Sequence, residues 1–490
     1  MERGALVICH LRWRDRETRR ENAASKKRAS ERRLIFLDKA ILSCYTEISK
    51  NEGDMRSSGR KKNTFMIYNV LEYGILGDGE TNNTAAINAL TKRISEHGGT
   101  VYFPAGAYVS GSIHLYSNMT LMLDAGATIL GSHDFNDYPF IELDGFTRGT
   151  RHGLISAVNA RNIRITGGRI DGRGKYFWDN MESDYERPRT INPILCKDVA
   201  IENLIIENSP CWTIHPLACE NVSISGVTIY NPYDSPNTDG INPESSKNVR
   251  ITNCHIDVGD DCVTIKAGTE SDPLMKTRPC ENIVVSGCTM AHGHGGVVIG
   301  SEMSGGVKNV MVSNCVFQNT ERGIRLKTRR KRGGAVQGAS FSNIMMENVG
   351  AVITMNAYYC CVCGEYPFPK EILFDEGPQP IDEMTPVISD IRINGITARN
   401  VLGVGIYLYG LPESPIRNVS ILDVSMEIVG CEEGFPPVAA FNRVRCKGEG
   451  ILLENTDNVS IQGANIRCAR EKLIMKNAKN TLINEKAIES

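Results

Sequence analysis

Two adjacent carboxylates, Asp260 and Asp261, occur in the stretch from His255 to Lys266, which reads HIDVGDDCVTIK. They follow Gly259 and precede a β-branched run, although strands disfavour aspartate and neighbouring carboxylates repel each other. A tight turn that carries a solvated acid pair would account for this stretch taken alone. Polar residues at matching positions elsewhere in the chain favour a chemical site instead.

The matching positions lie in four segments, NTDGIN, GDDCVTIK, GHGGVVIG and RGIRLKT. The first inward apolar residues of these segments are Ile241, Val263, Val297 and Ile324. Asp239 and Asp261 each lie two places before that residue, and Asp260 and His294 each lie three places before it. If the segments stack as successive strands, the three acids and the histidine come together.

Two cations complete this group. Arg325 and Lys327 alternate with the apolar residues Ile324 and Leu326, so they point outward from the strand. Each of these residues has an ordinary explanation by itself, as a turn residue, a flexible loop residue or part of a solvated face. Their shared register over four consecutive segments predicts one outer patch of three acids, one histidine and two cations.

The composition of this patch suggests its chemistry. Three close carboxylates cannot all ionise easily, so at least one pKa should rise and leave a group able to donate a proton. The remaining carboxylates can polarise a water molecule, and glycoside hydrolysis needs this division of roles. The two cations favour a negatively charged substrate such as a uronic acid. Nearby aromatic residues either stack on sugar rings or pack within loops: Tyr176, Phe177, Trp178 and Trp212.

A recurring phrase predicts the scaffold of the patch. Asn or Asp is followed by apolar residues one and three places later, then by a second bend that often carries Gly or Asn. Asn and Asp tolerate the left-handed conformation of a tight bend, and the apolar spacing of two excludes a helix. This pattern predicts a right-handed parallel β-helix. The first-bend positions are Asn162, Asp198, Asn221, Asn248, Asn282, Asn309, Asn343, Asp390, Asn418 and Asn458.

The segment before the repeats predicts a cap for the solenoid. GDGETNNTAAINALTKRISEHGG reads as a loop, a helix of about 12 residues that begins at Asn83 or Thr84, and a glycine stop. Such a helix would cover the open end of the first turn. Cys254, Cys288 and Cys315 share one inward register, so we expect a stack of small buried side chains there and no metal site. We expect no cofactor.

Hydropathy, charge and cysteine content indicate which kinds of partner and location to expect. No run of about 18 apolar residues exists, so we expect no membrane span. Residues 1–65 form a basic extension, with 17 Lys and Arg against 9 Asp and Glu in residues 1–64. We interpret it as a solvated tail or as sequence outside the fold, and not as a nucleic-acid arm. The fold should then occupy residues 66–490 as one catalytic domain. Sixteen cysteines without a recognisable export signal predict a cytoplasmic location.

The motifs NTDG, GDDC, GHG and RLK, in this order, resemble glycoside hydrolase family 28, the polygalacturonase family. The similarity extends from about Met66 to the end and includes YGILGDGETNNTAAI and GGTVYFPAGAY. It implies an inverting hydrolase of α-linked galacturonic acid in pectic poly- or oligosaccharides. The implied roles are Asp260 as the general acid, Asp239 and Asp261 as activators of water, His294 as support for the acid, Arg325 and Lys327 as ligands of the substrate carboxylate, and Asn237 as a residue lining the site.

The resemblance leaves several related functions to separate. Gly259 stands where many relatives carry Gln, which affects local substrate contacts only. Long intervals such as AGTESDPLMKTRP and residues 344–389 favour a bacterial-type, exo-acting enzyme because they wall off one end of a cleft. The alternatives are a rhamnogalacturonan or xylogalacturonan hydrolase of the same family, a pectate lyase, and a noncatalytic carbohydrate-binding β-helix.

Overall fold

The computed structural model describes residues 66–141, 150–180, 187–360, 368–438 and 444–485. The chain from Phe65 to Ser490 forms one compact unit. The basic extension expected at residues 1–65 lies outside the described residues. Within the described part of the chain, no helix is both long and apolar enough to cross a membrane.

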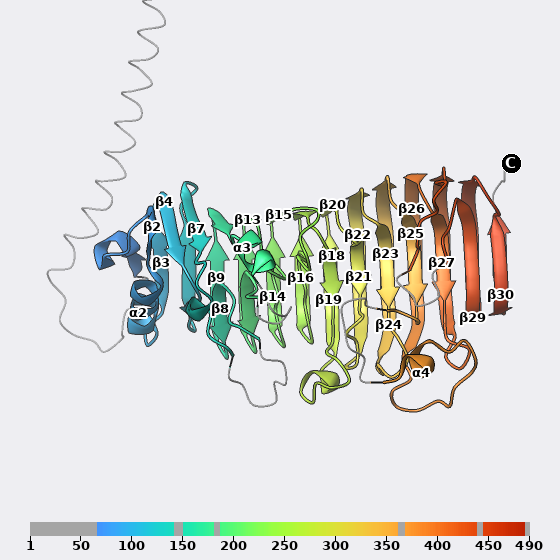
Figure 1. Cartoon of the computed structure of the whole chain (residues 1–490), viewed down its shortest axis with the longest axis horizontal. Coiled ribbons are helices and arrows are strands. Elements are labelled where there is room, and N and C mark those ends of the chain that lie inside the picture. Colours follow the sequence, from blue (N-terminus) through green and yellow to red (C-terminus); the bar gives the residue numbers. More distant parts are fainter. Residues whose placement is uncertain (1–65, 142–149, 181–186, 361–367, 439–443, 486–490) are drawn as a thin grey trace, which may run out of the picture. The chain divides into compact units, whose positions relative to one another are not determined.

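The repeats form a right-handed parallel β-helix, as the bend pattern predicted (Figure 1). Its first face begins at the first bend of each turn and contains β1 (Ile67–Asn69), β3 (Gly99–Phe103), β6 (Met119–Leu123), β9 (Arg161–Thr166), β12 (Lys197–Glu202), β14 (Glu220–Ser225), β16 (Lys247–Thr252), β19 (Cys280–Ser286) and β31 (Leu482–Glu485). The second face contains β2 (Asp78–Asn82), β4 (Gly106–Ser110), β7 (Ala127–Gly131), β10 (Arg169–Asp171), β13 (Ile205–Glu207), β15 (Thr228–Tyr230), β17 (His255–Asp257) and β20 (Thr289–His292).

Longer strands continue from the first face to the second: β22 (Val307–Gln318), β24 (Ala335–Glu347), β26 (Val387–Val401) and β28 (Ile416–Ile428). β29 (Glu449–Cys468) begins on the third face and continues through the first face to the second. The third face contains β5 (Ile113–Leu115), β8 (Ile155–Val158), β11 (Ile191–Ile194), β18 (Asp261–Ile265), β21 (Gly295–Ile299), β23 (Arg322–Lys327), β25 (Ala351–Asn356), β27 (Val404–Tyr409) and β30 (Leu473–Lys479). The helices are short: η2 (Val70–Tyr73), α2 (Thr84–Ile94), η3 (Phe135–Asp137), α3 (Lys175–Asp179), η4 (Met275–Thr277) and α4 (Lys370–Phe374).

The first bends adopt the left-handed conformation that the Asn and Asp residues predicted. Their φ angles lie between 52° and 60° at all ten expected positions. The side chains also form a ladder across the turns, in which Nδ2 of Asn248 donates to Asn221 (3.1 Å) and Nδ2 of Asn282 donates to Asn248 (2.9 Å). The bend is therefore stabilised both by its backbone conformation and by contacts between turns.

The sequence assignment of one bend was wrong. Ala339 pairs with Val310 and Ile391, so Gly338, with φ of 67°, occupies the first bend of that turn. Asn343 belongs to the second bend instead, where its Nδ2 donates to Asn314 (3.3 Å). The error arose because both bends use left-handed residues and the first bend of this turn carries Gly.

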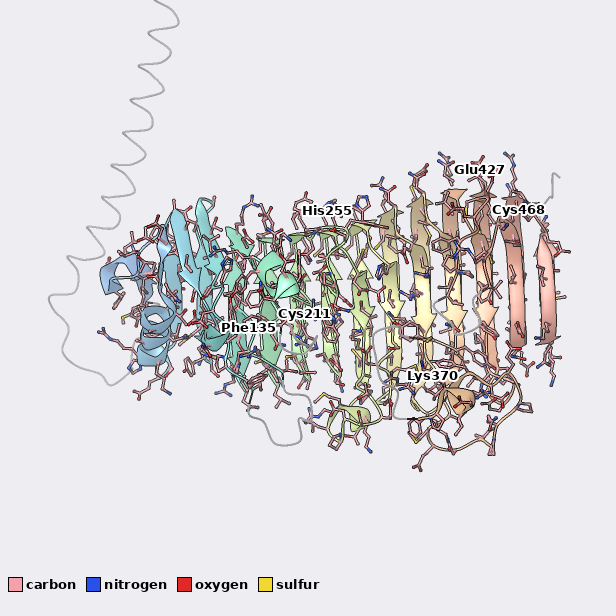
Figure 2. The ribbon with its side chains drawn as sticks, in the orientation of Figure 1. Phe135, Cys211, His255, Lys370, Glu427 and Cys468 are labelled. Atoms are coloured by element: carbon pink, nitrogen blue, oxygen red, sulfur yellow. The ribbon has the colours of Figure 1, made fainter. Side chains whose placement is uncertain are left out.

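The interior is a continuous apolar core along the stack, with outward side chains on both edges (Figure 2). Cys254, Cys288 and Cys315 are 3%, 1% and 1% exposed and form the expected buried stack. The N-terminal helix α2 adds Ile87, Leu90 and other apolar residues to this core, so it covers the first turn as predicted.

Helix α2 begins where the sequence predicted, but the side chain of its N-cap residue does not cap the helix. Asn83 occupies the N-cap position, and its side chain makes no hydrogen bond to the helix. Its side chain instead accepts from the Leu76 amide (2.9 Å) and donates to the Leu76 carbonyl (2.9 Å). Asn83 therefore fastens the preceding loop to the start of the helix.

Candidate active site

The four aligned segments occupy successive turns of the third face. Ile241 pairs with Val263, Val263 with Val297, and Val297 with Ile324. These pairs are the alignment that the sequence predicted. Parallel strands lie about 4.8 Å apart, so the polar residues at matching positions become neighbours.

The three acids form one cluster. One carboxylate oxygen of each of Asp239, Asp260 and Asp261 lies within 4.8 Å of the others. Asp239 and Asp261 are 3% and 1% exposed, whereas the side chain of Asp260 is 19% exposed. Asp260 is therefore the acid that a large substrate can reach.

Asp261 is an ionised carboxylate that two cations hold in place. Arg325 Nη1 lies 3.0 Å from its Oδ1, and Lys327 Nζ lies 2.6 Å from its Oδ2. Burial opposes ionisation, but Lys327 and Arg325 outweigh it and hold the pKa of Asp261 well below its usual range. Asp261 therefore keeps its charge at any ordinary working pH.

Asp239 has the opposite electrostatic environment. Burial and the charge of Asp260 raise the pKa of Asp239 to about 7. Its Oδ2 accepts hydrogen bonds from Asn242 Nδ2 (2.8 Å) and Thr264 Oγ1 (3.1 Å). The expectation that at least one acid of the cluster has a raised pKa is met by Asp239.

His294 supports Asp260, as the register predicted. Its Nδ1 lies 3.1 Å from Asp260 Oδ1, and its backbone amide donates to the Asp260 carbonyl (2.9 Å). Burial opposes the charged imidazole, but the hydrogen bond and the charge of Asp260 together raise the pKa of His294. Gly259 permits the tight approach behind Asp260, because a Cβ there would lie 2.4 Å from the Ser235 carbonyl oxygen.

The acids lie close together. Inverting glycosidases usually hold their acid and base carboxyl groups more than about 6 Å apart. In this cluster one oxygen of each acid lies within 4.8 Å of the others. A water molecule can still hydrogen-bond to two oxygens at this spacing, because each bond needs only about 2.8 Å.

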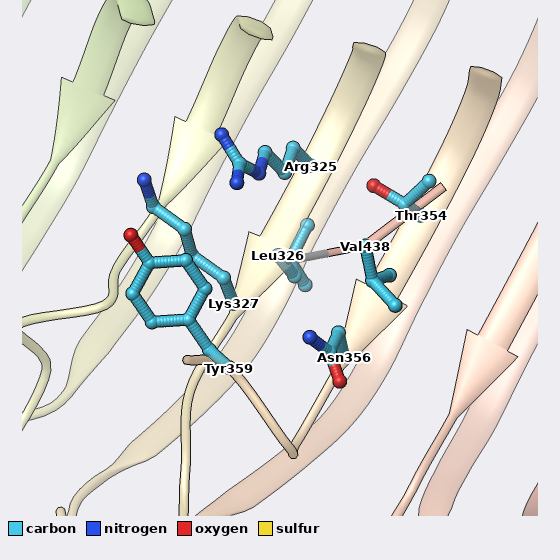
Figure 3. Close-up of a pocket in the computed structure, with 7 residues that line it drawn as sticks. All are labelled: Arg325, Leu326, Lys327, Thr354, Asn356, Tyr359 and Val438. Atoms are coloured by element: carbon cyan, nitrogen blue, oxygen red, sulfur yellow. The ribbon is translucent and has the colours of Figure 1, made fainter. Parts of the chain in front are cut away.

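A pocket adjoins the cations on the C-terminal side (Figure 3). Arg325, Leu326, Lys327, Thr354, Asn356, Tyr359 and Val438 surround about 160 Å³ of space. Lys327 Nζ lies 5.1 Å from the centre of the Tyr359 ring, which covers it. Asn356 is 2% exposed, and among the described residues its Nδ2 has no hydrogen-bond partner. The pocket thus offers cations and an unused donor to a polar ligand.

The aromatic candidates have separate positions. Trp212 lies beside the cluster, where Lys266 Nζ is 4.6 Å from the centre of its ring. Phe177 is fully buried and belongs to the core. Tyr176 stacks on His133 with ring centres 4.6 Å apart, and Trp178 donates from Nε1 to the Pro210 carbonyl (3.0 Å). Loop packing is therefore the observed role of Tyr176 and Trp178, and core packing is that of Phe177. A sugar contact stays a prediction for Trp212.

Asn237 lies in the bend just before Asp239, with φ of 53°. Its Oδ1 accepts a hydrogen bond from Arg187 Nη2 (2.6 Å). Arg187 also donates to the Pro210 carbonyl (3.0 Å), so it ties this bend to the neighbouring turn. Asn237 is thus held close to the acids, as its predicted position requires.

Buried arginines tie together the long inserted loops on the lower side of the stack, where Figure 1 shows η4 and α4. Arg329 and Arg332 bind Glu270 at 2.7 and 2.8 Å, and Arg330 binds Glu413 at 2.5 Å. These arginines belong to the uniformly basic run RRKR (residues 329–332). The sequence gave no sign of their partners, because these lie 59 or more residues away.

Comparisons with known proteins relate the chain to one family of enzymes. The family model described as Glycosyl hydrolases family 28 matches residues 99–433. A Vitis vinifera protein named "Probable polygalacturonase" is 34% identical over 384 residues, which cover 75% of each chain. The "Exo-poly-alpha-D-galacturonosidase" of Dickeya chrysanthemi is 28% identical over 352 residues, which cover 60% of this chain and 57% of the other. The crystal structure of an exopolygalacturonase from Thermotoga maritima has a TM-score of 0.67 and 27% identity, and the match covers 86% of this chain and 92% of that one.

A parallel β-helix that carries paired acids and cations on one face is a scaffold for carbohydrate chemistry. The extent of the family match decides its class, because it covers more than half of the chain. The chain belongs to glycosyl hydrolases family 28, and it is a glycoside hydrolase.

Proposed function

We propose that the protein hydrolyses the α-glycosidic bonds of galacturonic acid in pectin-derived poly- or oligosaccharides. The opposite electrostatic environments of two neighbouring acids carry this proposal. Asp239 has a pKa raised to about 7, and Arg325 and Lys327 keep Asp261 ionised beside it. Enzymes that need an acid and a base at one pH use pairs of carboxylates separated in this way.

The proton that the leaving group needs is shared by Asp239 and Asp260. Asp260 delivers it, because Asp260 is the more exposed of the two and lies against His294. The glycosidic C–O bond breaks as the leaving oxygen takes this proton. A water molecule forms the new C–O bond at the anomeric carbon, and Asp261 accepts the proton that the water releases. Proton transfer from Asp261 back to the pair restores the starting state.

The substrate class follows from the cations and from the relatives. Arg325 and Lys327 place two positive charges beside the pocket, so they favour a substrate that carries a carboxylate. A uronic acid supplies it. Relatives named exo-polygalacturonases support action at a chain end, and the inserted loops tied by Arg329, Arg330 and Arg332 support a closed end of the groove.

Product analysis on homogalacturonan and its oligomers tests this proposal. We expect galacturonate monomers from the first minutes onward and no intermediate ladder of oligomers, together with a fall in rate as the pH rises through about 7, where the shared proton is lost. An early ladder would show endo action. A product that absorbs in the ultraviolet would show elimination by a lyase, and binding without new reducing ends would show a noncatalytic protein.

The stereochemical course is tested by proton NMR of the first product. An inverted anomer is expected, because the water attacks from the face opposite to the leaving oxygen. A retained anomer would instead make one carboxylate the nucleophile, which the short spacing of the acids permits.

A further inference from the structure

The side-chain column that holds the acids continues toward the N-terminal end of the β-helix. Ile191 pairs with Ile214, and Ile214 pairs with Ile241. Two places before these residues stand Arg189, Trp212 and Asp239, respectively. Arg189 therefore occupies the same register as Asp239 and lies two turns away from it, or about 10 Å along the stack.

Arg189 is a buried cation for which the described residues provide no counter-charge. It is 4% exposed, and no carboxylate among the described residues binds it. Its Nε has no acceptor there, and its Nη1 has only the Arg187 carbonyl at 3.5 Å. A buried charged group of this kind costs free energy unless a partner of opposite charge arrives.

Two nearby acids in the described part of the chain, Glu244 and Glu302, already bind other residues. Glu244 Oε2 lies 2.9 Å from His215 Nε2, and Glu302 Oε2 lies 3.0 Å from Lys266 Nζ. Trp212 holds the guanidinium in place, with its ring centre 5.0 Å from the Arg189 Cζ atom. Arg189 is thus positioned by an aromatic ring and left available to an anion.

The surroundings of Arg189 also carry unused polar groups. Thr190 Oγ1, Asn192 Oδ1 and Asn242 Oδ1 are buried and have no hydrogen-bond partner within the described part of the chain. Buried polar atoms normally find a partner, so a group of them on one face indicates a polar ligand. An acidic sugar supplies both kinds of group that are missing, a carboxylate for Arg189 and hydroxyl donors for the two amide oxygens.

We propose that Arg189, positioned by Trp212, binds the carboxylate of a second uronic acid unit on the N-terminal side of Asp239. This proposal rests on the proposed function and refines it. Arg325 and Lys327 bind the carboxylate of one sugar unit near the three aspartates. Arg189 binds the carboxylate of another sugar unit about two turns away. The enzyme therefore selects oligosaccharides with acidic sugars at both positions.

The test compares three substrates on the full-length protein: tetragalacturonate, and two analogues in which galactose replaces the galacturonate at one end or at the other. The wild type should discriminate against one analogue by about 10- to 100-fold in kcat/KM, the range for a hydrogen bond to a charged group. Arg189→Gln should lose this discrimination, mainly through KM, and should treat the other analogue as the wild type does. Arg189→Lys should retain part of it, because the charge remains without the planar fork.

Arg164→Gln is the matched control, because Arg164 is an exposed arginine on the first face that binds Glu202 at 3.1 Å. A purely structural role would make Arg189→Gln lower kcat/KM equally on all three substrates, and this result would overturn the proposal, as would unchanged discrimination. If Arg189→Gln does not fold, full discrimination by Arg189→Lys would overturn it. A wild type that releases no reducing ends from any of the three would refute the proposed function itself.

Discussion

At the scale of single residues, the site is a set of charges whose balance depends on burial. Asp239 and Asp261 share one register and nearly the same exposure, yet their pKa values move in opposite directions. The difference lies in their partners. Asp261 binds Arg325 and Lys327, whereas the side-chain donors to Asp239 among the described residues are the neutral groups of Asn242 and Thr264. Three predictions follow from this balance.

Asp239→Asn should make the protein more stable at pH 8 than the wild type. The folded pKa of Asp239, about 7, lies above the ordinary value of 3.8, so folding favours the protonated form. In the wild type, the contribution of Asp239 to the free energy of unfolding is fully present below pH 4 and is lost as the pH rises to about 7. Because each pKa unit corresponds to about 1.4 kcal/mol, we expect a gain of about 2–4 kcal/mol at pH 8 and little change at pH 4. Thermal unfolding at both pH values measures it; an equal shift at both would contradict the raised pKa.

Lys327→Ala should weaken both substrate binding and the action of Asp261 as the base. The sequence suggested that Arg325 and Lys327 serve the substrate carboxylate alone, but both already bind Asp261. Without Lys327 the pKa of Asp261 moves up, so kcat/KM should fall at least about 30-fold and its acid limb should shift to higher pH. Lys308→Ala, which removes an exposed lysine paired with Glu281, is the control. An unmoved acid limb would restrict Lys327 to substrate binding.

Asp260→Asn should keep the shape of the site and remove the proton donor. General acid catalysis contributes about 10²–10⁴-fold, so kcat should fall by that factor while substrate still binds. A substrate whose leaving group needs no protonation should recover part of the rate. Measuring kcat with both substrates tests this prediction, and an unchanged melting temperature shows that the variant is folded. An equal fall in kcat on both substrates would mean that Asp260 is not the general acid.

At the scale of elements, the asparagine ladder holds the turns in register. Asn248 has φ of 57°, donates to Asn221 and accepts from Asn282. Asn248→Gly keeps the bend and loses only the ladder, whereas Asn248→Ala also forces a Cβ into the left-handed region at about 1–2 kcal/mol. We therefore expect the alanine variant to melt at a lower temperature than the glycine variant, and both below the wild type. The reverse order would mean that the bend conformation contributes little.

At the scale of the whole molecule, the first turn is complete from Met66 onward. β1 pairs with β3 at Ile67 and Thr100, and α2 covers the core. A chain that begins at Met66 should therefore fold and retain the full activity of the proposed hydrolase. Circular dichroism, thermal unfolding and reducing-end assays beside the full chain measure this. Loss of soluble protein or of activity would show that residues 1–65 contribute to the fold.

The sequence by itself determined the β-helix, the co-registered acids and cations, and the capping helix, because each depends on local rules. A spacing of two sets the side-chain direction, and left-handed Asn and Asp residues mark the bends. Where two bends used the same residue type, as at Gly338 and Asn343, the local rule failed. Only the tertiary structure decided that Asp239 carries the raised pKa and that the acids lie within 4.8 Å of one another. It also showed that Arg189 is buried without a carboxylate partner among the described residues, because burial and distances between turns depend on segments far apart in the chain.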